Sequence, residues 1–187
     1  TVTVRDPGPD GKFKTADDGV FYQEFTVSVT PVNHRPSFKK GKNVSVLEDS
    51  GRKSIPGWAS PKSISVGPAN ESWQKPTFVV TAANPALFAE QPAIDPATGT
   101  LTFTPAQDAF GKTTVTVVLS DHGGGQETSP PQTFTIEIKP VNDKPTFTLG
   151  GDVTVAQDSG LISRPGFLMG FSPGPANEAT QKLGALL

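Results

Sequence analysis

The sequence predicts an all-β protein built from tandem β-sandwich repeats with Greek-key connections. Val, Phe and Ile alternate with polar residues in many short runs, and this period of two is typical of half-buried strands. Clusters of Gly, Pro, Asp and Asn separate the runs at intervals of about ten residues. An eight-residue motif also occurs twice, as PVNHRPSF at 31–38 and as PVNDKPTF at 140–147.

The motif fixes the length of the repeating unit. Its two copies lie 109 residues apart, which is too long for a solenoid repeat and suits a whole β-sandwich domain. Without a gap, 17 of 38 positions are identical between 21–58 and 130–167, and the segment GPANE at 67–71 recurs at 174–178. We therefore expect three parts. These are the closing part of an upstream repeat (1–35), a complete repeat (36–144) and the opening part of a downstream repeat (145–187).

The expected strands follow from the alternating runs. A hairpin turn is predicted at 94–99, where Asp, Pro and Gly occupy turn-favoured positions. A glycine-rich loop, 121–131, joins the last two strands. In chain order, the expected strands are 2–4, 25–29, 44–47, 76–82, 101–104, 113–119 and 133–139.

The composition excludes several classes of function. The net charge is −2 and the Lys and Arg residues are scattered, so nothing indicates nucleic-acid binding. No apolar run approaches the roughly 18 residues that a membrane span needs. Cysteine is absent, so the core or bound ions must stabilise the fold without disulfides.

Four segments resemble a known family. The alternating stretch 115–123, followed by 134–147, resembles the closing signature of a cadherin repeat, and 94–101 and 46–49 resemble two further cadherin segments. The PVNDxP form is similar to bacterial cadherin-like and Ig-like tandem repeats of large surface or secreted proteins. The resemblance implies a structural or adhesive stalk at the cell surface or outside the cell, with neighbouring repeats as partners. It also implies calcium at the linkers, with Glu48 as a ligand.

The chain departs from the family at several calcium positions. The family's linker begins with an aspartate, whereas this chain has Pro31 and Pro140. The family's Leu-Asp-Arg-Glu motif is replaced by Ala-Gln-Asp-Ala at 106–109, and His34 stands where the second linker has Asp143. We therefore expect one ion or none at each junction, and joints of unequal stiffness.

Oxygen-bearing side chains near the second linker form the first candidate calcium site. Calcium takes six to eight oxygen ligands from carboxylates, amides and backbone carbonyls. Glu48, Asp121, Asn142 and Asp143 could supply them. The alternative is that Asn142 and Asp143 form only a turn between two prolines.

A second candidate calcium site lies in the acidic loop near the N-terminus. Asp6, Asp10, Gly11 and Asp17 fall at positions 1, 5, 6 and 12 of an EF-hand-style loop. Position 3 is Gly8, which offers no side-chain ligand, and no helices are expected beside the loop. The alternative is a solvated acidic hairpin loop.

Other functions have weaker signals. Trp58 aligns with Phe167 and is expected in the core, whereas Trp73 aligns with Thr180 and is expected at the surface, where it could stack on a glycan. The two histidines, His34 and His122, lie in a linker and a loop without a nucleophile motif, so we expect no enzyme activity. The alternatives to a stalk are a glycan- or protein-binding module and an accessory domain of a secreted enzyme.

Overall fold

The computed structural model describes residues 1–14, 16–17 and 19–184. Strands dominate, and the helices are single 3₁₀ turns, so the all-β expectation is confirmed. Residue contacts divide the chain into two compact units, Thr1–Val32 and Asn33–Leu187. No helix in the described ranges is long and apolar enough to cross a membrane.

The first unit is a β-hairpin. Strand β1 (Val2–Asp6) pairs antiparallel with β2 (Gly19–Gln23), and Val2 lies opposite Gln23. The predicted strand at 25–29 is wrong, because these residues have no strand partner. Their counterparts in the second unit, 134–138, pair with residues 111–115 of a longer strand.

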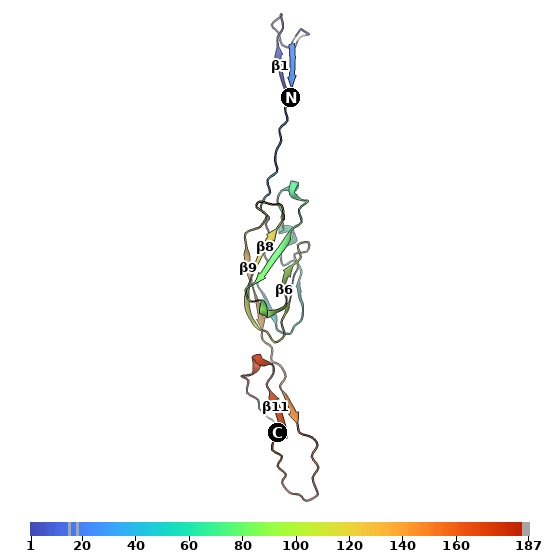
Figure 1. The fold of residues 1–187 in the computed structure, drawn as a ribbon, viewed down its shortest axis with the longest axis vertical. Coiled ribbons are helices and arrows are strands. Elements are labelled where there is room, and N and C mark those ends of the chain that lie inside the picture. The colour runs from blue at the N-terminus through green and yellow to red at the C-terminus, as the bar shows by residue number, and fades with distance from the viewer. Residues whose placement is uncertain (15, 18, 185–187) are drawn as a thin grey trace. The chain divides into compact units, whose positions relative to one another are not determined.

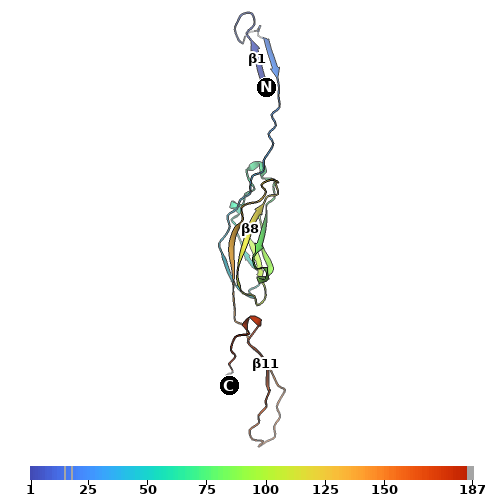
Figure 2. The same ribbon diagram turned by 60° about the vertical axis from the view of Figure 1, so that its left-hand side comes forward.

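The second unit contains two larger sheets. Figure 1 labels their strands β6, β8 and β9, and Figure 2 shows β8 from another side. The four-stranded sheet has the order β3-β9-β8-β5, in which β3 and β9 are parallel and the other neighbours antiparallel. The three-stranded sheet has the order β4-β7-β6 and is antiparallel. The bounds are β3 (Val44–Leu47), β4 (Lys53–Ile55), β5 (Thr77–Ala82), β6 (Phe88–Ile94), β7 (Leu101–Pro105), β8 (Gly111–Ser120) and β9 (Gln132–Lys139).

Five predicted strands of these two sheets are confirmed, and the sequence did not predict the other two strands of the sheets, β4 and β6. Strand β4 is only three residues long with one large apolar residue, too short to show a period. Strand β6 contains the buried Pro92 and two shifts of register, which disrupt the alternation.

Both sheets contribute to one core, an arrangement compatible with a β-sandwich. Leu101 and Phe103 come from one sheet, and Val117 and Ile136 from the other; all four are at most 1% exposed. Burying such a side chain contributes about 1.5–3 kcal/mol. Trp58 is also buried, with its ring 4.3 Å from that of Phe134, which confirms its expected place in the core.

The last part of the second unit is a smaller hairpin. Strand β10 (Thr146–Leu149) pairs antiparallel with β11 (Leu168–Ser172), and the Phe147 and Phe171 rings lie 6.5 Å apart. Four 3₁₀ turns complete the described elements: η1 (Pro61–Ser63), η2 (Ala69–Glu71), η3 (Pro85–Leu87) and η4 (Ala176–Glu178).

Candidate functional site

The first GPANE segment folds around a buried carboxylate. Pro68 precedes η2, and the Glu71 backbone N–H donates to the Pro68 carbonyl at 2.9 Å. The Glu71 side chain then folds back onto Gly67, which has φ +135°. A Cβ at Gly67 would lie 1.9 Å from Glu71 Oε2, so only glycine leaves room for the carboxylate. Glu71 is consequently only 4% exposed.

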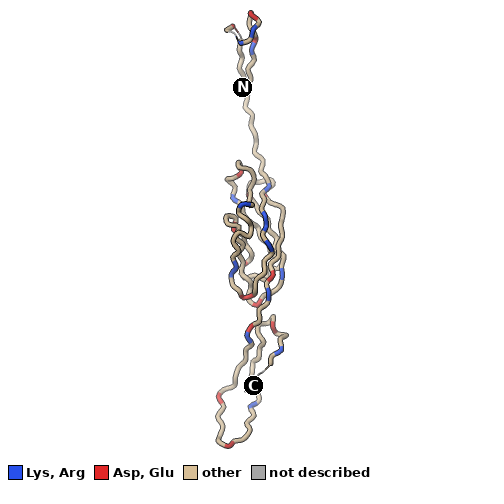
Figure 3. The backbone as a smooth tube through the Cα atoms, turned by 180° about the vertical axis from the view of Figure 1, so that it is seen from behind, with Lys and Arg blue, Asp and Glu red and all other residues tan. Residues whose placement is uncertain are grey.

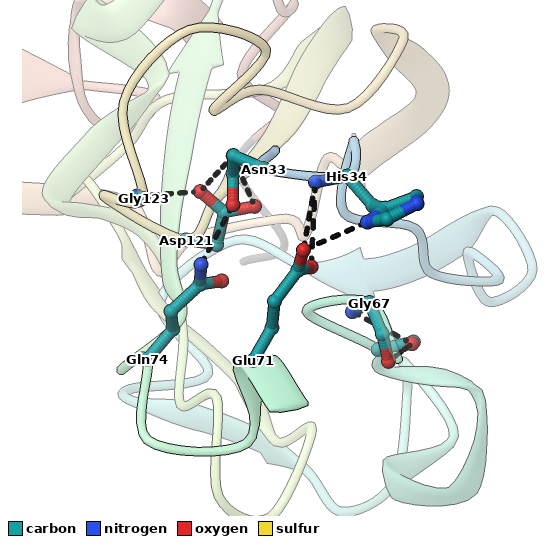
Figure 4. Close-up of polar contacts among 8 residues, drawn as sticks. Asn33, His34, Gly67, Glu71, Gln74, Asp121 and Gly123 are labelled. Atoms are coloured by element: carbon teal, nitrogen blue, oxygen red, sulfur yellow. Dashed lines mark hydrogen bonds and ion pairs between the residues drawn. The ribbon is translucent and has the colours of Figure 1, made fainter. Parts of the chain in front are cut away.

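This carboxylate binds the first linker. The His34 backbone N–H donates to Glu71 Oε1 at 3.1 Å, and His34 Nδ1 lies 2.7 Å from the same oxygen (Figure 4). Asn33, beside it, accepts a hydrogen bond from Gln74 Nε2 at 2.6 Å. The Asn33 amide also faces Asp121, with Nδ2 3.4 Å from Oδ1. Residues 33–34 are therefore held by side chains from two separate segments.

The second GPANE segment makes the same bond to the second linker. The Asp143 backbone N–H donates to Glu178 Oε1 at 3.0 Å, and Glu178 is 6% exposed. A Cβ at Gly174, with φ +156°, would lie 2.0 Å from Glu178 Oε2. The two copies differ in the side chain beside the glutamate. It is an imidazole at His34 and a carboxylate at Asp143.

The second linker is also held by a glutamate beside β3, the strand that pairs with β9. Glu48, which follows β3, is 2% exposed and accepts the Val141 backbone N–H at 2.8 Å. Its other oxygen lies 3.5 Å from Asn177 Nδ2 of the second GPANE segment. Two glutamates thus hold this linker, because the Val141 N–H donates to Glu48 and the Asp143 N–H donates to Glu178. We call Glu48, Glu71 and Glu178 the linker-binding glutamates.

Three aspartates gather beside the second linker. One carboxylate oxygen from each of Asp49, Asp108 and Asp143 lies within 4.8 Å of the others. Asp143 Oδ2 is buried and has no hydrogen-bond partner. Burial raises the pKa of Asp143, and the nearby carboxylates of Glu178, Asp108 and Asp49 raise it further. Neighbouring carboxylates repel one another, so such a cluster favours the binding of a proton or a cation. Carboxylate oxygens are ligands that calcium prefers.

The structure does not bring the four residues predicted for the second linker together. Asp121 follows β8, which runs antiparallel to β9, so it lies at the opposite end of the sheet from Lys139 and Glu48. There Asp121 is 1% exposed and accepts the Gly123 N–H at 2.8 Å. Asn142 Nδ2 donates to the Asp143 carbonyl at 2.9 Å. Of the four, only Asp143 belongs to the aspartate cluster.

In the predicted EF-hand-style loop, two of the aspartates accept hydrogen bonds from nearby backbone N–H groups. Asp6 Oδ1 accepts the Gly8 N–H and Asp10 Oδ1 accepts the Lys12 N–H, both at 2.8 Å, which is the pattern of Asx turns. Within the described residues, Asp49, Asp108 and Asp143 are the one set of three carboxylates close enough to share an ion, and Asp6, Asp10 and Asp17 are not such a set. Thr15 and Asp18 of this loop lie outside the described residues.

Four residues of these sites were not predicted from the sequence. Glu71 and Glu178 lie in the recurring GPANE segment, and the recurrence by itself indicates a repeat and not a role for the glutamate. Asp49 also recurs, as Asp158, and both adopt positive φ. Asp108 carried no such signal. It joins the cluster because its backbone N–H donates to Asp49 Oδ1 at 3.1 Å.

The remaining candidate groups have other partners. His122 Nε2 lies 2.7 Å from Thr77 Oγ1, and the neighbouring Asp121 bonds to Gly123. Trp73 is 72% exposed, as expected. Basic and acidic residues are interspersed along the backbone in Figure 3. No protein-family model matches the sequence, and no curated protein matches it.

Proposed function

We propose that this chain is a structural repeat module, a spacer or stalk with an adhesive role, of a bacterial protein at the cell surface or outside the cell. Its partners are neighbouring cadherin-like repeats with Greek-key connections, and it catalyses no reaction. One observation carries the proposal. Both copies of GPANE bury a glutamate that accepts a linker backbone N–H, His34 in one copy and Asp143 in the other.

The linker chemistry supports a spacer. Pro140 and Pro145 fix φ and lack backbone donors, which stiffens the segment and stops the sheet from continuing through it. Glu48 and Glu178 accept the N–H groups of Val141 and Asp143 between these prolines. Hydrogen bonds to charged acceptors are stronger than neutral ones, so the linker is held in one conformation.

Hydrogen exchange of two linker amides tests this role. The His34 and Asp143 N–H groups are expected to exchange slowly, because each is bonded to a buried carboxylate. Glu178→Ala should speed the exchange of the Asp143 N–H and leave the His34 N–H protected. Glu71→Ala should speed the exchange of the His34 N–H and leave the Asp143 N–H protected. Rapid exchange of both amides in the unsubstituted chain would refute a fixed linker.

Calcium at the aspartate cluster is the second part of the proposal. Asp49, Asp108 and Asp143 would supply carboxylate oxygens, and the unpaired Asp143 Oδ2 would gain a partner. An open pocket lined by Asp108, Asn142 and Asp143 gives an ion access. The first linker has His34 in place of Asp143, so we propose that calcium stiffens only the second joint.

Melting with and without calcium tests the ion. EDTA should lower the melting temperature and calcium should raise it again, since a ligand that binds only the folded state stabilises it. Asp108→Asn should abolish the response. Asp158→Asn, which alters the exposed counterpart of Asp49, should leave it intact. A calcium response equal in both variants, or none in the unsubstituted chain, would exclude this site.

Glycan binding is a second candidate function, favoured by the exposure of Trp73. An exposed indole offers a flat face for a sugar ring. A glycan array on the full chain and on Trp73→Ala distinguishes this function from a spacer. A glycan signal that disappears in Trp73→Ala would support binding, whereas a blank array leaves the spacer as the better proposal.

A further inference from the structure

Two neighbouring segments of the second unit concentrate positive charge. Residues 35–47 and 50–66 contain seven Lys and Arg residues and no Asp or Glu, although the whole chain has a net charge of −2. A local excess of one charge attracts ligands of the opposite charge, even on a protein whose net charge is small. Four of these seven cations are exposed lysines, namely Lys39, Lys40, Lys42 and Lys62.

Hydrogen bonds hold the two segments side by side. The Lys39 backbone N–H donates to Ser63 Oγ at 3.1 Å, beside Lys62. The Trp58 indole N–H donates to the Lys42 carbonyl at 2.9 Å. Strands β3 and β4, which belong to these segments, are each the outermost strand of their sheet. The lysines of both segments therefore gather along one edge of the two sheets.

The four lysines carry charges that no carboxylate neutralises. Among the residues that the structure describes, none of them forms an ion pair. The neighbouring cations differ in this respect. Arg52 pairs with Glu90 at 3.5 Å, and Lys53 Nζ donates to the Ser50 carbonyl at 2.7 Å. The charges of the four lysines are consequently available to a ligand.

The lysine run is not part of the sequence that the repeats share. Residues 39–42 read KKGK, whereas the corresponding residues 148–151 read TLGG. The shared glycine has a packing role, because a Cβ at Gly41 would lie 2.4 Å from the Trp58 carbonyl oxygen. The lysines beside it have no such role in the core, since their side chains are exposed. Their presence in this repeat alone of the two indicates a local function.

An open groove lies beside the lysines, lined by residues of both segments. Its volume is about 500 Å³, within the range of sites that bind small molecules. Ile55, Pro56 and Trp58 give it an apolar wall, and Lys42 and Ser45 add hydrogen-bonding groups. A sugar ring has an apolar face and a rim of hydroxyl groups, so it matches a groove with both kinds of lining.

We propose that this groove binds an acidic polysaccharide. A sugar ring occupies the groove beside Trp58, and the lysines at 39, 40 and 42 bind the carboxylate or sulfate groups of the same polymer. A lysine is a point charge on a flexible stem, which suits anionic groups repeated along a chain. This binding activity goes beyond the spacer role and does not depend on the linker bonds, on calcium or on Trp73.

Titration of the full chain with four polymers tests the class of ligand. The polymers are polygalacturonate, dextran sulfate, neutral dextran and polyphosphate, and EDTA is present so that no metal ion bridges the partners. We expect binding to polygalacturonate or dextran sulfate, and the tighter of the two identifies carboxylate or sulfate as the preferred group. Polyphosphate has charge without a sugar ring, so it should bind at least about fivefold more weakly. Absence of binding to both acidic polysaccharides, or equal binding of dextran or polyphosphate, would overturn the proposal.

A triple lysine variant tests the charge. It carries Lys39→Gln, Lys40→Gln and Lys42→Gln, and its affinity for the acidic polysaccharide should fall at least about tenfold. The matched control removes the same charge from three exposed positions elsewhere in the unit, with Lys75→Gln, Lys112→Gln and Lys139→Gln. The control should stay within about twofold of the unsubstituted chain, because exposed charges at a distance are screened by salt. Equal losses in both triple variants would show attraction without a site and would refute the groove.

A groove-filling variant tests the shape while every lysine stays in place. Ser45 is an exposed residue of β3 that lines the groove, and tyrosine suits a strand, so Ser45→Tyr should fold. Its affinity should fall at least about fivefold. Melting curves verify that each variant is folded. Unchanged binding by a folded Ser45→Tyr variant would contradict the proposal. These measurements are independent of the hydrogen-exchange test of the spacer.

Discussion

Removing the Glu71 carboxylate should destabilise the second unit by a predictable amount. Glu71 is 4% exposed and accepts the His34 backbone N–H. A hydrogen bond to a charged group contributes about 1.5–3 kcal/mol. The contact to the His34 ring adds less than about 1 kcal/mol, because that side chain is 59% exposed. We therefore expect Glu71→Ala to lower the free energy of unfolding by about 2–3 kcal/mol.

Guanidinium denaturation followed by tryptophan fluorescence measures this loss. Trp58 is buried against Phe134 and reports on the core. For a unit of this size, the expected loss corresponds to a fall in melting temperature of roughly 4–12 °C. Glu71→Gln keeps an oxygen that can accept the His34 backbone N–H, so this variant should lose only about 1 kcal/mol of the free energy of unfolding.

Glu127→Ala is the matched control. Glu127 is exposed, and a substitution there should change the stability by less than about 0.5 kcal/mol. If Glu71→Ala also stays within about 0.5 kcal/mol of the unsubstituted chain, the buried carboxylate does not hold the linker. The proposed role of GPANE would then be wrong.

Three further predictions follow from individual contacts. Gly67→Ala should destabilise by about 1–3 kcal/mol through the clash with the buried carboxylate, whereas Gly151→Ala, which meets open space, should be near neutral in the same melts. The pKa of Asp143 is raised, so the folded chain binds that proton more tightly. In EDTA, the free energy of unfolding should therefore fall as the pH rises from 3.8 through the raised pKa of Asp143. Melting curves over this pH range measure the fall, and Asp143→Asn should remove it. Phe103→Ala should cost about 3–5 kcal/mol in denaturant titrations, because the ring is 1% exposed.

The alternating runs predicted the strands well because packing against one core imposes a period of two. Thr113–Leu119 and Thr133–Lys139 became β8 and β9 with small changes at their ends. The same pattern failed at 25–29, where alternation is present but no partner strand pairs with it. Periodicity shows which residues suit a strand, and pairing decides whether the strand forms.

The candidate sites were harder to predict because their side chains come from distant parts of the sequence. The directions of the strands decide which of these side chains lie close together. Asp121 and Asp143 belong to one sequence signature, yet the direction of β8 places them at opposite ends of the sheet. The Asp108 backbone N–H donates to Asp49 Oδ1, and no local sequence pattern predicts this bond between two loops. The linker-binding role of Glu71 depends on the space left by Gly67, which becomes visible only when the turn is built.

Backbone ¹⁵N relaxation of the second linker tests the central claim most directly. Val141 and Asp143 donate to Glu48 and Glu178, so their amides should be as ordered as those of β9, with order parameters near about 0.85. Glu48→Ala combined with Glu178→Ala should lower these values and leave β9 unchanged. Order parameters below about 0.6 in the unsubstituted linker would contradict a spacer with fixed joints.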